Sequence, residues 1–443
     1  MPLRQLSRRE YAVNLAGTAL AAVAYRRRER WSVERVRAWQ LWRVRRLVEH
    51  AMARVPLYRD KYRAAGFRPG DVRSWADFQR LPTVTKAELV AGYPDRSVDR
   101  DADLDDCLLS TSSGSTGRMM EIPHRADRLW PYVLATERLF RWIAGRYPPS
   151  WRQAYVYTSP YPVRPIPGVY PITFIPTDAD PEPILAALRR CRPELLAVYP
   201  SILRELLTTD ADAMRDLRLR AVSVNSELST QVERDAWSSA LSCPVGDDYS
   251  SEELTRIAAQ CPNGSYHLME DVTLTEILDP DADHPAGGLG EVVGTELHNT
   301  AMPFIRYRQG DLARLDPKPC SCGRPQRVLS GLVGRVNDGF TLADGRTLPA
   351  GFLLDACYRA LMREPGVAAA YRLVQLEGDR AVIQVQRGPR WEAARGESLA
   401  RAVQREAGDR IRVALAVVDD LPREPSGKRQ TIVGRAAQIG RLA

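Results

Sequence analysis

Ser110-Thr-Ser-Ser-Gly-Ser-Thr-Gly-Arg118 directly follows the apolar run Cys107-Leu-Leu109. Its small hydroxylated residues and two glycines allow backbone N–H groups and hydroxyls to close around phosphate oxygens, because glycine lets a chain approach a ligand closely. The stretch lacks the Gly-x-x-x-x-Gly-Lys-Ser/Thr order of a Walker loop. It predicts a phosphate-binding loop of another kind, and a flexible Ser/Gly loop is the alternative.

Three further segments follow in order along the chain. Thr300-Ala-Met-Pro-Phe-Ile-Arg-Tyr-Arg-Gln-Gly-Asp311 ends in a carboxylate after a glycine turn, which can accept both hydroxyls of a ribose. The alternative is a turn aspartate paired with an arginine. Gly334-Arg-Val-Asn-Asp338 stands where the sequence pattern changes, and Leu421-Pro-Arg-Glu-Pro-Ser-Gly-Lys428 lies near the C-terminus.

Lysine is scarce in this chain. Lys61, Lys86, Lys318 and Lys428 are the four lysines among 63 basic residues, so a lysine at a chemically plausible position stands out. Lys428 therefore favours a functional group over the alternative, a solvated basic tail.

The apolar pattern predicts an α/β fold with two unequal domains. Between residues 105 and 300, short apolar runs at 154–157, 195–199, 221–224 and 290–293 alternate with helix-like stretches, which indicates sheets covered by helices. The Pro-rich segment 159–176 predicts a loop.

The pattern changes after Asp338. Helix-like stretches at 351–364 and 391–406 interleave with strand-like runs at 371–375, 381–386 and 411–418. We therefore predict a large domain at 1–337, which starts with a helical segment at 1–66, and a small α+β domain at 338–443.

Composition narrows the class of protein. The chain has 443 residues, a net charge of +8 and 44% hydrophobic residues, which excludes wholesale disorder, a collagen-like sequence or a coiled coil. No nucleic-acid-binding motif accompanies the basic charge, so no nucleic-acid partner is expected. Seven cysteines, an odd number, indicate a reduced compartment rather than a disulfide framework.

The uncharged run 11–25 is shorter than the about 20 residues that span a bilayer. Its Arg flanks and Ala22-Val-Ala24 imitate a signal peptide, but a peripheral helix is preferred and no transmembrane segment is expected.

Taken together, the four segments resemble the adenylate-forming superfamily of acyl- and aryl-CoA ligases. They are most similar to the branch of phenylacetate-CoA ligase and the capsule-type adenylyltransferases. The resemblance covers nearly the whole chain, including Val48-Glu-His-Ala51, Val55-Pro-Leu-Tyr58 and Leu81-Pro-Thr-Val-Thr-Lys86, which are typical of that branch. Tyr199-Pro-Ser-Ile202 and Ser226-Glu-Leu228 look like its substrate-pocket and adenine-binding segments.

The resemblance implies a role for each matching residue. The loop Ser112, Ser113, Gly114, Ser115, Thr116 and Gly117 would wrap the ATP phosphates, and Ser226, Glu227, Leu228, Asp247, Asp248, Tyr249, Ser250 and Ser251 would line the adenine. Asp311 would hold the ribose, Glu253 would hold Mg²⁺, and Arg335 would contact the nucleotide. Asp338 would be the hinge between the large domain, which would bind ATP and the acid, and the small domain, which would be mobile. Lys428 would reach the carboxylate and the α-phosphate, and Tyr157, Tyr199 and Ser201 would contribute to the substrate pocket.

The resemblance implies a cytoplasmic ATP-dependent ligase that activates a carboxylic acid, aromatic or aryl-like, as an acyl-AMP with release of pyrophosphate. Transfer to the CoA thiol is preferred. Transfer to an amine or another nitrogen nucleophile in a biosynthetic pathway is the same-fold alternative, and an inactive nucleotide-binding partner protein is the other. A homodimer is compatible with the sequence.

The sequence departs from the pattern of this branch at two places, which concern the Mg²⁺ ligand and the identity of the acid and the acceptor. Tyr249-Ser-Ser-Glu-Glu253 replaces the usual Tyr-Gly-x-Ser/Thr-Glu, so Glu252 is an alternative to Glu253 as the Mg²⁺ ligand. Tyr157-Thr-Ser-Pro-Tyr-Pro-Val-Arg164 lacks the branch's glycine-rich stretch, which leaves the acid and the acceptor open.

Cys261, His267, Cys320 and Cys322 form a separate set of candidate metal ligands in turn-like sequence. Three thiolates and one imidazole fit a closed tetrahedral structural zinc site. Unpaired cysteines and a hydrogen-bonded histidine are the alternative.

Overall fold

The structure is a computed structural model that describes residues 6–112, 120–158, 169–177, 179–332, 334, 340–341, 347–348, 357, 367–376, 379–407, 411–421 and 431–434. The chain separates into two compact units. Unit 1 comprises residues 1–114, 118–142 and 248–332, and unit 2 comprises residues 115–117, 143–247 and 333–443. The division of the chain at Asp338 stays a prediction.

Unit 1 begins with helices, as the sequence predicts. They are α1 (Arg8–Arg28), α2 (Val33–Arg54), α3 (Pro56–Ala64), α4 (Trp75–Gln79) and α5 (Lys86–Ala91). Capping boxes start α1, α4 and α5, where the side chains of Ser7, Ser74 and Thr85 each accept a hydrogen bond from the backbone N–H three residues further on, in the first turn of the helix. Among the described residues, no helix is both long enough and apolar enough to cross a membrane.

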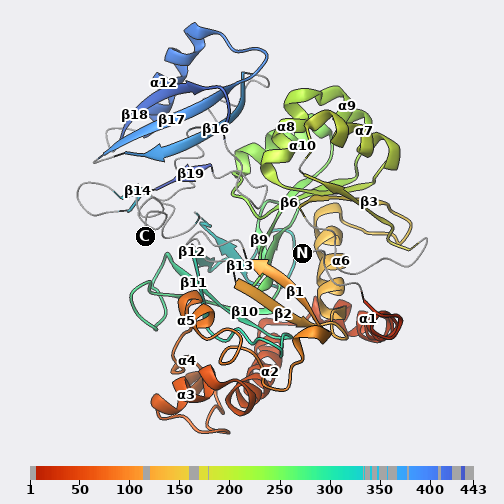
Figure 1. Cartoon of the computed structure of the whole chain (residues 1–443), viewed down its shortest axis with the longest axis vertical. Helices are drawn as coiled ribbons and strands as arrows, with labels where there is room; N and C mark the ends of the chain where they lie inside the picture. Colours follow the sequence, from red (N-terminus) through yellow and green to blue (C-terminus); the bar gives the residue numbers. More distant parts are fainter. Residues whose placement is uncertain are drawn as a thin grey trace. The chain divides into compact units, whose positions relative to one another are not determined.

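Helix α1 packs on helix α6 (Trp130–Ala144) through hydrogen bonds and one close approach of its backbone (Figure 1). The Asn14 side chain donates to the Ala126 carbonyl at 2.7 Å and accepts from the N–H groups of Leu129 at 2.6 Å and Trp130 at 3.0 Å. A Cβ at Gly17 would lie 2.6 Å from the Trp130 ring, so this close approach requires glycine. These contacts dock one face of α1.

Two antiparallel sheets complete unit 1. Strands β1 (Cys107–Ser112) and β2 (Met120–Arg125) pair with each other. The larger sheet has the order β10 (Thr273–Leu278), β11 (Gly290–Glu296), β12 (Tyr307–Asp316), β13 (Val328–Ser330), β9 (Tyr266–Leu268), β8 (Thr255–Gln260) and β7 (Val245–Ser251), of which residues 245–247 belong to unit 2. This sheet carries Tyr249 and Asp311.

Unit 2 contains a parallel sheet with the order β6 (Ala221–Asn225), β5 (Leu195–Val198), β3 (Gln153–Tyr157) and β4 (Ile172–Pro176). All four residues of β5 are buried, which is typical of a strand covered on both faces. Helices α7 (Pro181–Cys191), α8 (Pro200–Thr209), α9 (Ala211–Asp216) and α10 (Gln231–Leu241) connect or flank these strands.

Strand β4 corrects the sequence-based prediction of a loop over 159–176. Ile172-Thr-Phe-Ile-Pro176 pairs with β3 at the edge of the sheet, where proline is tolerated because no further strand needs its missing N–H. The prolines of this segment predict a loop, although Ile172 to Ile175 form a short run of β-branched and aromatic residues that is typical of a strand. Residues 159–168 lie outside the described residues.

The C-terminal part of unit 2 is an α+β arrangement, as predicted. Its four-stranded sheet has the order β18 (Arg412–Val418), β17 (Arg380–Arg387), β16 (Ala368–Gln375) and β19 (Ile432–Val433), and it is accompanied by helix α12 (Ala393–Ala407) and the short pair β14 (Phe340–Thr341) and β15 (Thr347–Leu348). The helix predicted at 351–364 falls outside the described residues except for Cys357.

Candidate active site

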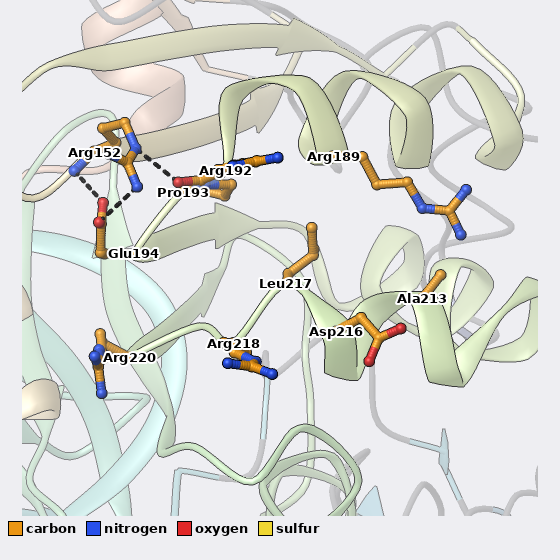
Figure 2. A pocket seen from close by; sticks show the side chains of 10 residues that line it. All are labelled: Arg152, Arg189, Arg192, Pro193, Glu194, Ala213, Asp216, Leu217, Arg218 and Arg220. Atoms are coloured by element: carbon orange, nitrogen blue, oxygen red, sulfur yellow. Dashed lines mark hydrogen bonds and ion pairs between the residues drawn. The ribbon is translucent and has the colours of Figure 1, made fainter.

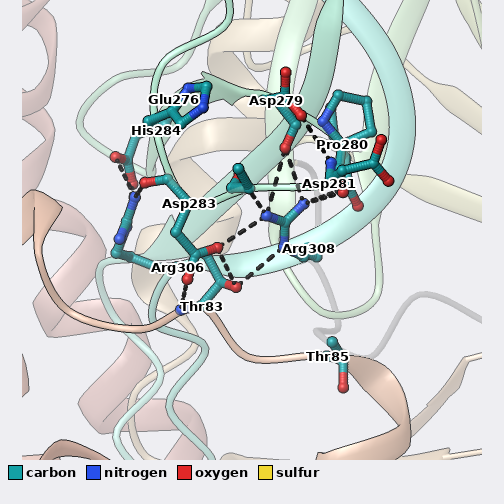
Figure 3. A network of polar contacts seen from close by, with 12 residues as sticks. Thr83, Thr85, Glu276, Asp279, Pro280, Asp281, Asp283, His284, Arg306 and Arg308 are labelled. Carbon is teal, nitrogen blue, oxygen red and sulfur yellow. Dashed lines mark hydrogen bonds and ion pairs between the residues drawn. The ribbon is translucent and has the colours of Figure 1, made fainter. Parts of the chain in front are cut away.

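Two arginines position strand β12, as Figure 3 shows. The Arg306 guanidinium is fully buried and donates to Glu276 at 3.1 Å and to the Gln79 carbonyl at 2.7 Å. Arg308 donates to the Thr83 hydroxyl at 3.0 Å and to Asp283 at 2.8 Å. These bonds join β12 to the loop before α5 and to the loop between β10 and β11.

The turn before Asp311 is fixed by a carboxylate. Glu291 pairs with Arg308 through one oxygen, and its other oxygen accepts from the Gly310 N–H at 3.0 Å. Gly310 has a φ of 82°, a conformation that favours glycine. The motif residues between 306 and 310 therefore orient the aspartate that follows them.

Asp311 and Tyr249 are two predicted nucleotide-binding residues, distant in the sequence, that the structure brings into contact. The Tyr249 hydroxyl donates to Asp311 Oδ2 at 2.7 Å, although the residues are 62 positions apart. Both residues are buried: Tyr249 is 9% exposed and Asp311 is 8% exposed. A carboxylate beside an aromatic ring offers a hydroxyl acceptor next to a stacking surface, which suits a nucleoside.

Glu253 lies in the connection between β7 and β8, in the same unit. It is buried, whereas Glu252 is exposed. Its Oε1 lies 3.5 Å from Lys86 Nζ and accepts from the Tyr307 hydroxyl at 3.3 Å. The burial and contacts favour Glu253 over Glu252 as the candidate metal-binding carboxylate.

Lys86 lies at the candidate site, although the sequence motifs assign it no role there. It is the first residue of α5, and its ammonium donates to the Ser112 hydroxyl at 2.7 Å while facing Glu253. Ser112 ends β1 and is the first residue of the predicted phosphate loop. The scarcity of lysine was the signal that could have identified Lys86. Residues 113–117 of the loop lie outside the described residues.

Aromatic side chains gather at the carboxyl ends of β3 and β5 in unit 2. The rings of Tyr157 and Tyr199 meet edge to face with centroids 4.6 Å apart, and those of Tyr155 and Tyr157 lie 4.0 Å apart. The Tyr157 hydroxyl donates to Asn225 Oδ1 at 2.9 Å, and Asn225 ends β6. Three strands thus contribute to one cluster of tyrosines with an amide.

The residues predicted to line the adenine have structural partners. Glu227 accepts from the backbone N–H of Ser201 at 2.8 Å and from its hydroxyl at 2.9 Å, which caps helix α8. Ser226 has a φ of 68°, a left-handed conformation that costs a non-glycine residue about 1 kcal/mol or more. Such strain at the end of a strand is common at binding sites.

Other predicted lining residues are distributed as follows. Asp247 lies 3.9 Å from Arg234 in unit 2, whereas Asp248 pairs with Arg256 in unit 1. The Ser251 hydroxyl donates to Gln309 at 3.1 Å, the Ser250 hydroxyl approaches the Asp248 carbonyl at 3.4 Å, and Leu228 packs against the core that includes Phe340. Arg335, Asp338 and Lys428 lie outside the described residues.

A pocket of about 740 Å³ lies elsewhere in unit 2 (Figure 2). Five arginines line it, Arg152, Arg189, Arg192, Arg218 and Arg220. Arg152 and Arg220 directly precede β3 and β6, so the pocket lies at the amino ends of these parallel strands, opposite the tyrosine cluster. It contains no predicted site residue.

The cysteine and histidine set of unit 1 comes together in space. The ligand atoms of Cys261, His267, Cys320 and Cys322 all lie within 4.8 Å of one another. Cys261 Sγ and Cys320 Sγ are 3.8 Å apart, and His267 Nε2 lies 3.2 Å from Cys322 Sγ. The other ring nitrogen lies 3.3 Å from the Gln326 carbonyl, an arrangement that leaves Nε2 available as a ligand.

The donor set fits a structural metal. The 3.8 Å between Cys261 Sγ and Cys320 Sγ equals the separation of two thiolates that share a tetrahedral zinc ion, about 3.8 Å for Zn–S bonds of about 2.3 Å. Burial lowers the pKa of His267 to about 4, so the imidazole is neutral.

The fold is that of the adenylate-forming CoA ligases. A crystal structure of 2-hydroxyisobutyryl-CoA ligase in the postadenylation state has a TM-score of 0.77 and 23% identity, covering 94% of this chain and 93% of that chain. The anthranilate CoA ligase AuaEII in complex with anthranoyl-AMP has a TM-score of 0.57 and 17% identity over 75% of this chain and 67% of that chain.

The curated relatives are phenylacetate-coenzyme A ligases. Those of Thermus thermophilus and Aromatoleum evansii are each 26% identical and cover 90% and 93% of this chain and 96% and 95% of their own lengths. Protein CapK of Staphylococcus aureus is 25% identical over 34% of this chain and 33% of its own length. No protein-family model matches the sequence.

These similarities confirm the predicted fold class and the resemblance to the phenylacetate-CoA ligase and capsule-type branch. An enzyme of the acid–thiol ligase type fits these relatives.

Proposed function

We propose that this protein condenses a carboxylic acid with ATP to give an acyl-AMP and pyrophosphate, and then transfers the acyl group to the thiol of CoA with release of AMP. In the first step a carboxylate oxygen attacks the α-phosphorus and pyrophosphate leaves. In the second, the sulfur attacks the acyl carbon and AMP leaves. The buried contact between Tyr249 and Asp311 is the observation that carries the proposal.

Residues of unit 1 would bind the nucleoside, hold Mg²⁺ and attract the phosphates in the first step. Asp311 accepts the ribose hydroxyls, and Tyr249 provides an aromatic surface for the base. Glu253 would hold Mg²⁺, which neutralises phosphate charge when it is bound. Lys86 places an ammonium beside Glu253 and Ser112, at the edge of the phosphate loop, where it would attract phosphate oxygens.

The remaining parts are assigned by the resemblance. Ser113 to Gly117 would wrap the phosphates, Arg335 would contact the nucleotide, and Lys428 would stabilise the charge on the attacking carboxylate. Rotation of the small domain about Asp338 would then move Lys428 out of the active site and let the acceptor enter.

The acid is proposed to be aromatic. The edge-to-face rings of Tyr157 and Tyr199 support this, because aromatic rings prefer such contacts with a further ring. Asn225 and Thr158 add hydrogen-bonding groups to the cluster, since they contact the two tyrosine hydroxyls at 2.9 and 3.2 Å. The phenylacetate-CoA ligase relatives favour CoA as the acceptor. Transfer to an amine in a biosynthetic pathway remains the second candidate.

The test is pyrophosphate release with a panel of aromatic and aliphatic acids, with and without CoA, at the ATP and CoA levels of the cytoplasm, where we place the reaction. Acid-dependent release that CoA accelerates, together with an acyl-CoA product, is expected. Acid-dependent release with no effect of CoA, and product formation with an amine, would favour the second candidate. Absence of release with every acid would favour an inactive nucleotide-binding protein.

We also propose that Cys261, His267, Cys320 and Cys322 hold a structural zinc ion. All four positions would be protein ligands, so the ion would stabilise the loops that present them and leave no position for a catalytic water. The proximity of the four ligand atoms supports this assignment.

A further inference from the structure

Helix α1 has one face docked on unit 1 and one face exposed. The inner face docks on unit 1 through the buried Asn14 and Tyr25, while Gly17 allows the close approach to Trp130. Tyr25 and Trp130 meet edge to face with ring centroids 6.1 Å apart. None of these contacts uses a leucine or valine side chain of α1.

The outer face is aliphatic. Leu20 is 83% exposed, Val23 58%, Val13 44% and Leu15 41%. The other exposed positions from 12 to 24 are alanines, Ala12, Ala16, Ala19 and Ala24. At 100° per residue these eight positions fall within one half of the helix surface. An isolated exposed leucine is ordinary, but a continuous aliphatic face on a docked helix is a candidate interaction surface.

Arginines lie at both ends of this aliphatic face. Arg8 and Arg9 precede it, and Arg26 and Arg27 follow it; all four are exposed. The same helical arithmetic places all four on the aliphatic side of the helix, although Arg26 also pairs with Glu137 of α6 at 3.3 Å. The acidic residue of α1, Glu10, accepts from the Ser7 N–H at 2.7 Å in the capping box.

We propose that the outer face of α1 binds the surface of an anionic lipid bilayer, with the helix lying parallel to the membrane. The aliphatic side chains would enter the boundary between headgroups and acyl chains, and the arginines would contact lipid phosphates. The arrangement disfavours a second copy of the chain as occupant. Two such faces, packed parallel or antiparallel, would bring arginines against arginines at both ends.

The experiment is cosedimentation of the full chain with phosphatidylcholine vesicles, with and without phosphatidylglycerol. Binding should require the anionic lipid and weaken as salt rises, because salt screens the arginines. Leu20→Glu should reduce the partition coefficient about tenfold or more, since it places a charge in the aliphatic face. Leu289→Glu is the matched control, because Leu289 is 47% exposed but lies outside α1, and it should bind as the unchanged chain does.

A second pair of variants tests the charge. The double variant Arg8→Gln and Arg9→Gln should lower binding to anionic vesicles, whereas Arg63→Gln with Arg68→Gln removes the same charge from exposed positions elsewhere in unit 1 and should not. Equal losses in both pairs would show a general charge effect and overturn the proposal. So would equal binding to neutral vesicles, or sedimentation velocity that shows a dimer lost in Leu20→Glu without any vesicle binding.

Discussion

Lys61 and Lys86 are the first two lysines of the chain and both belong to unit 1, yet their partners differ. Lys61 pairs with Glu88, whose side chain is about a third exposed, whereas Lys86 faces the buried Glu253 and the Ser112 hydroxyl. The first pair joins two helices. The second places a charge at the edge of the phosphate loop.

Lys86→Ala should therefore slow acid-dependent pyrophosphate release by about tenfold or more, because it removes a fixed charge where phosphate charge develops. Lys61→Ala, the matched control, should change the rate little, since a partly exposed ion pair contributes about 1 kcal/mol or less to stability. Steady-state kinetics with varied ATP measure both. An equal loss in the two variants would remove Lys86 from the site.

Lys428→Ala should lower the first half-reaction on the order of a hundredfold. Transfer to the acceptor from chemically synthesised acyl-AMP should survive, because the rotated small domain would carry this lysine away before the thiol arrives. Lys428→Arg should restore little, since a planar guanidinium does not replace a compact ammonium in a fitted slot. Unchanged pyrophosphate exchange in Lys428→Ala would assign this lysine to a solvated tail.

At the scale of elements, the turns around β8 and β13 bring the cysteine cluster together. Cys320→Ser or Cys322→Ser should lower the zinc content from about one ion per chain toward zero and reduce the melting temperature, with no direct effect on the chemistry. Cys191→Ser, a half-buried cysteine outside the cluster, is the control. Metal analysis of protein purified without added zinc measures the content. Zinc-free protein with variants of unchanged stability would contradict the site.

The last residue of β11, Glu296, has a carboxyl group that should make stability depend on pH. One oxygen of Glu296 accepts from the N–H groups of His298 and Asn299, while the buried Oε1 has no hydrogen-bond partner in the described structure. Burial raises the pKa of Glu296 to about 7, from 4.5. The folded state thus binds this proton more tightly than the unfolded state.

The stability that this proton confers is complete below about pH 4.5 and is lost as the pH rises through about 7. Glu296→Gln keeps an acceptor for both N–H groups but does not titrate. The difference in unfolding free energy between variant and unchanged chain should therefore shift in favour of the variant by up to about 3 kcal/mol between about pH 4.5 and about pH 8. Denaturant titrations at a series of pH values measure it, and a constant difference would contradict it.

At the scale of the whole molecule, the hinge assignment concerns how the two half-reactions are separated. Asp338→Pro should restrict φ and hinder rotation after the adenylate has formed. We expect near-normal pyrophosphate exchange with loss of overall turnover. If exchange and turnover fall together, Asp338 supports the fold or the first step instead.

Sequence patterns predicted most of the architecture because local periodicity determines it. The strands around Tyr157, Tyr199 and Asn225 were expected from apolar runs, and the Tyr249–Asp311 region from motif resemblance. Strand β4 is not predicted, because the prolines of 159–176 favour a loop and the short apolar run shows its strand character only by pairing with β3. Lys86 is not predicted for a different reason, since its neighbours Ser112 and Glu253 are brought to it only by the fold.

The side chain of Asn14 makes the amides of Leu129 and Trp130 useful reporters. Both N–H groups donate to an oxygen that belongs to α1, so their protons become available to solvent only when that helix leaves α6. Hydrogen–deuterium exchange at these two positions would therefore measure the detachment of α1, independently of unfolding elsewhere in unit 1. A surface that holds α1 in place would slow this exchange, and one that pulls it away would accelerate it.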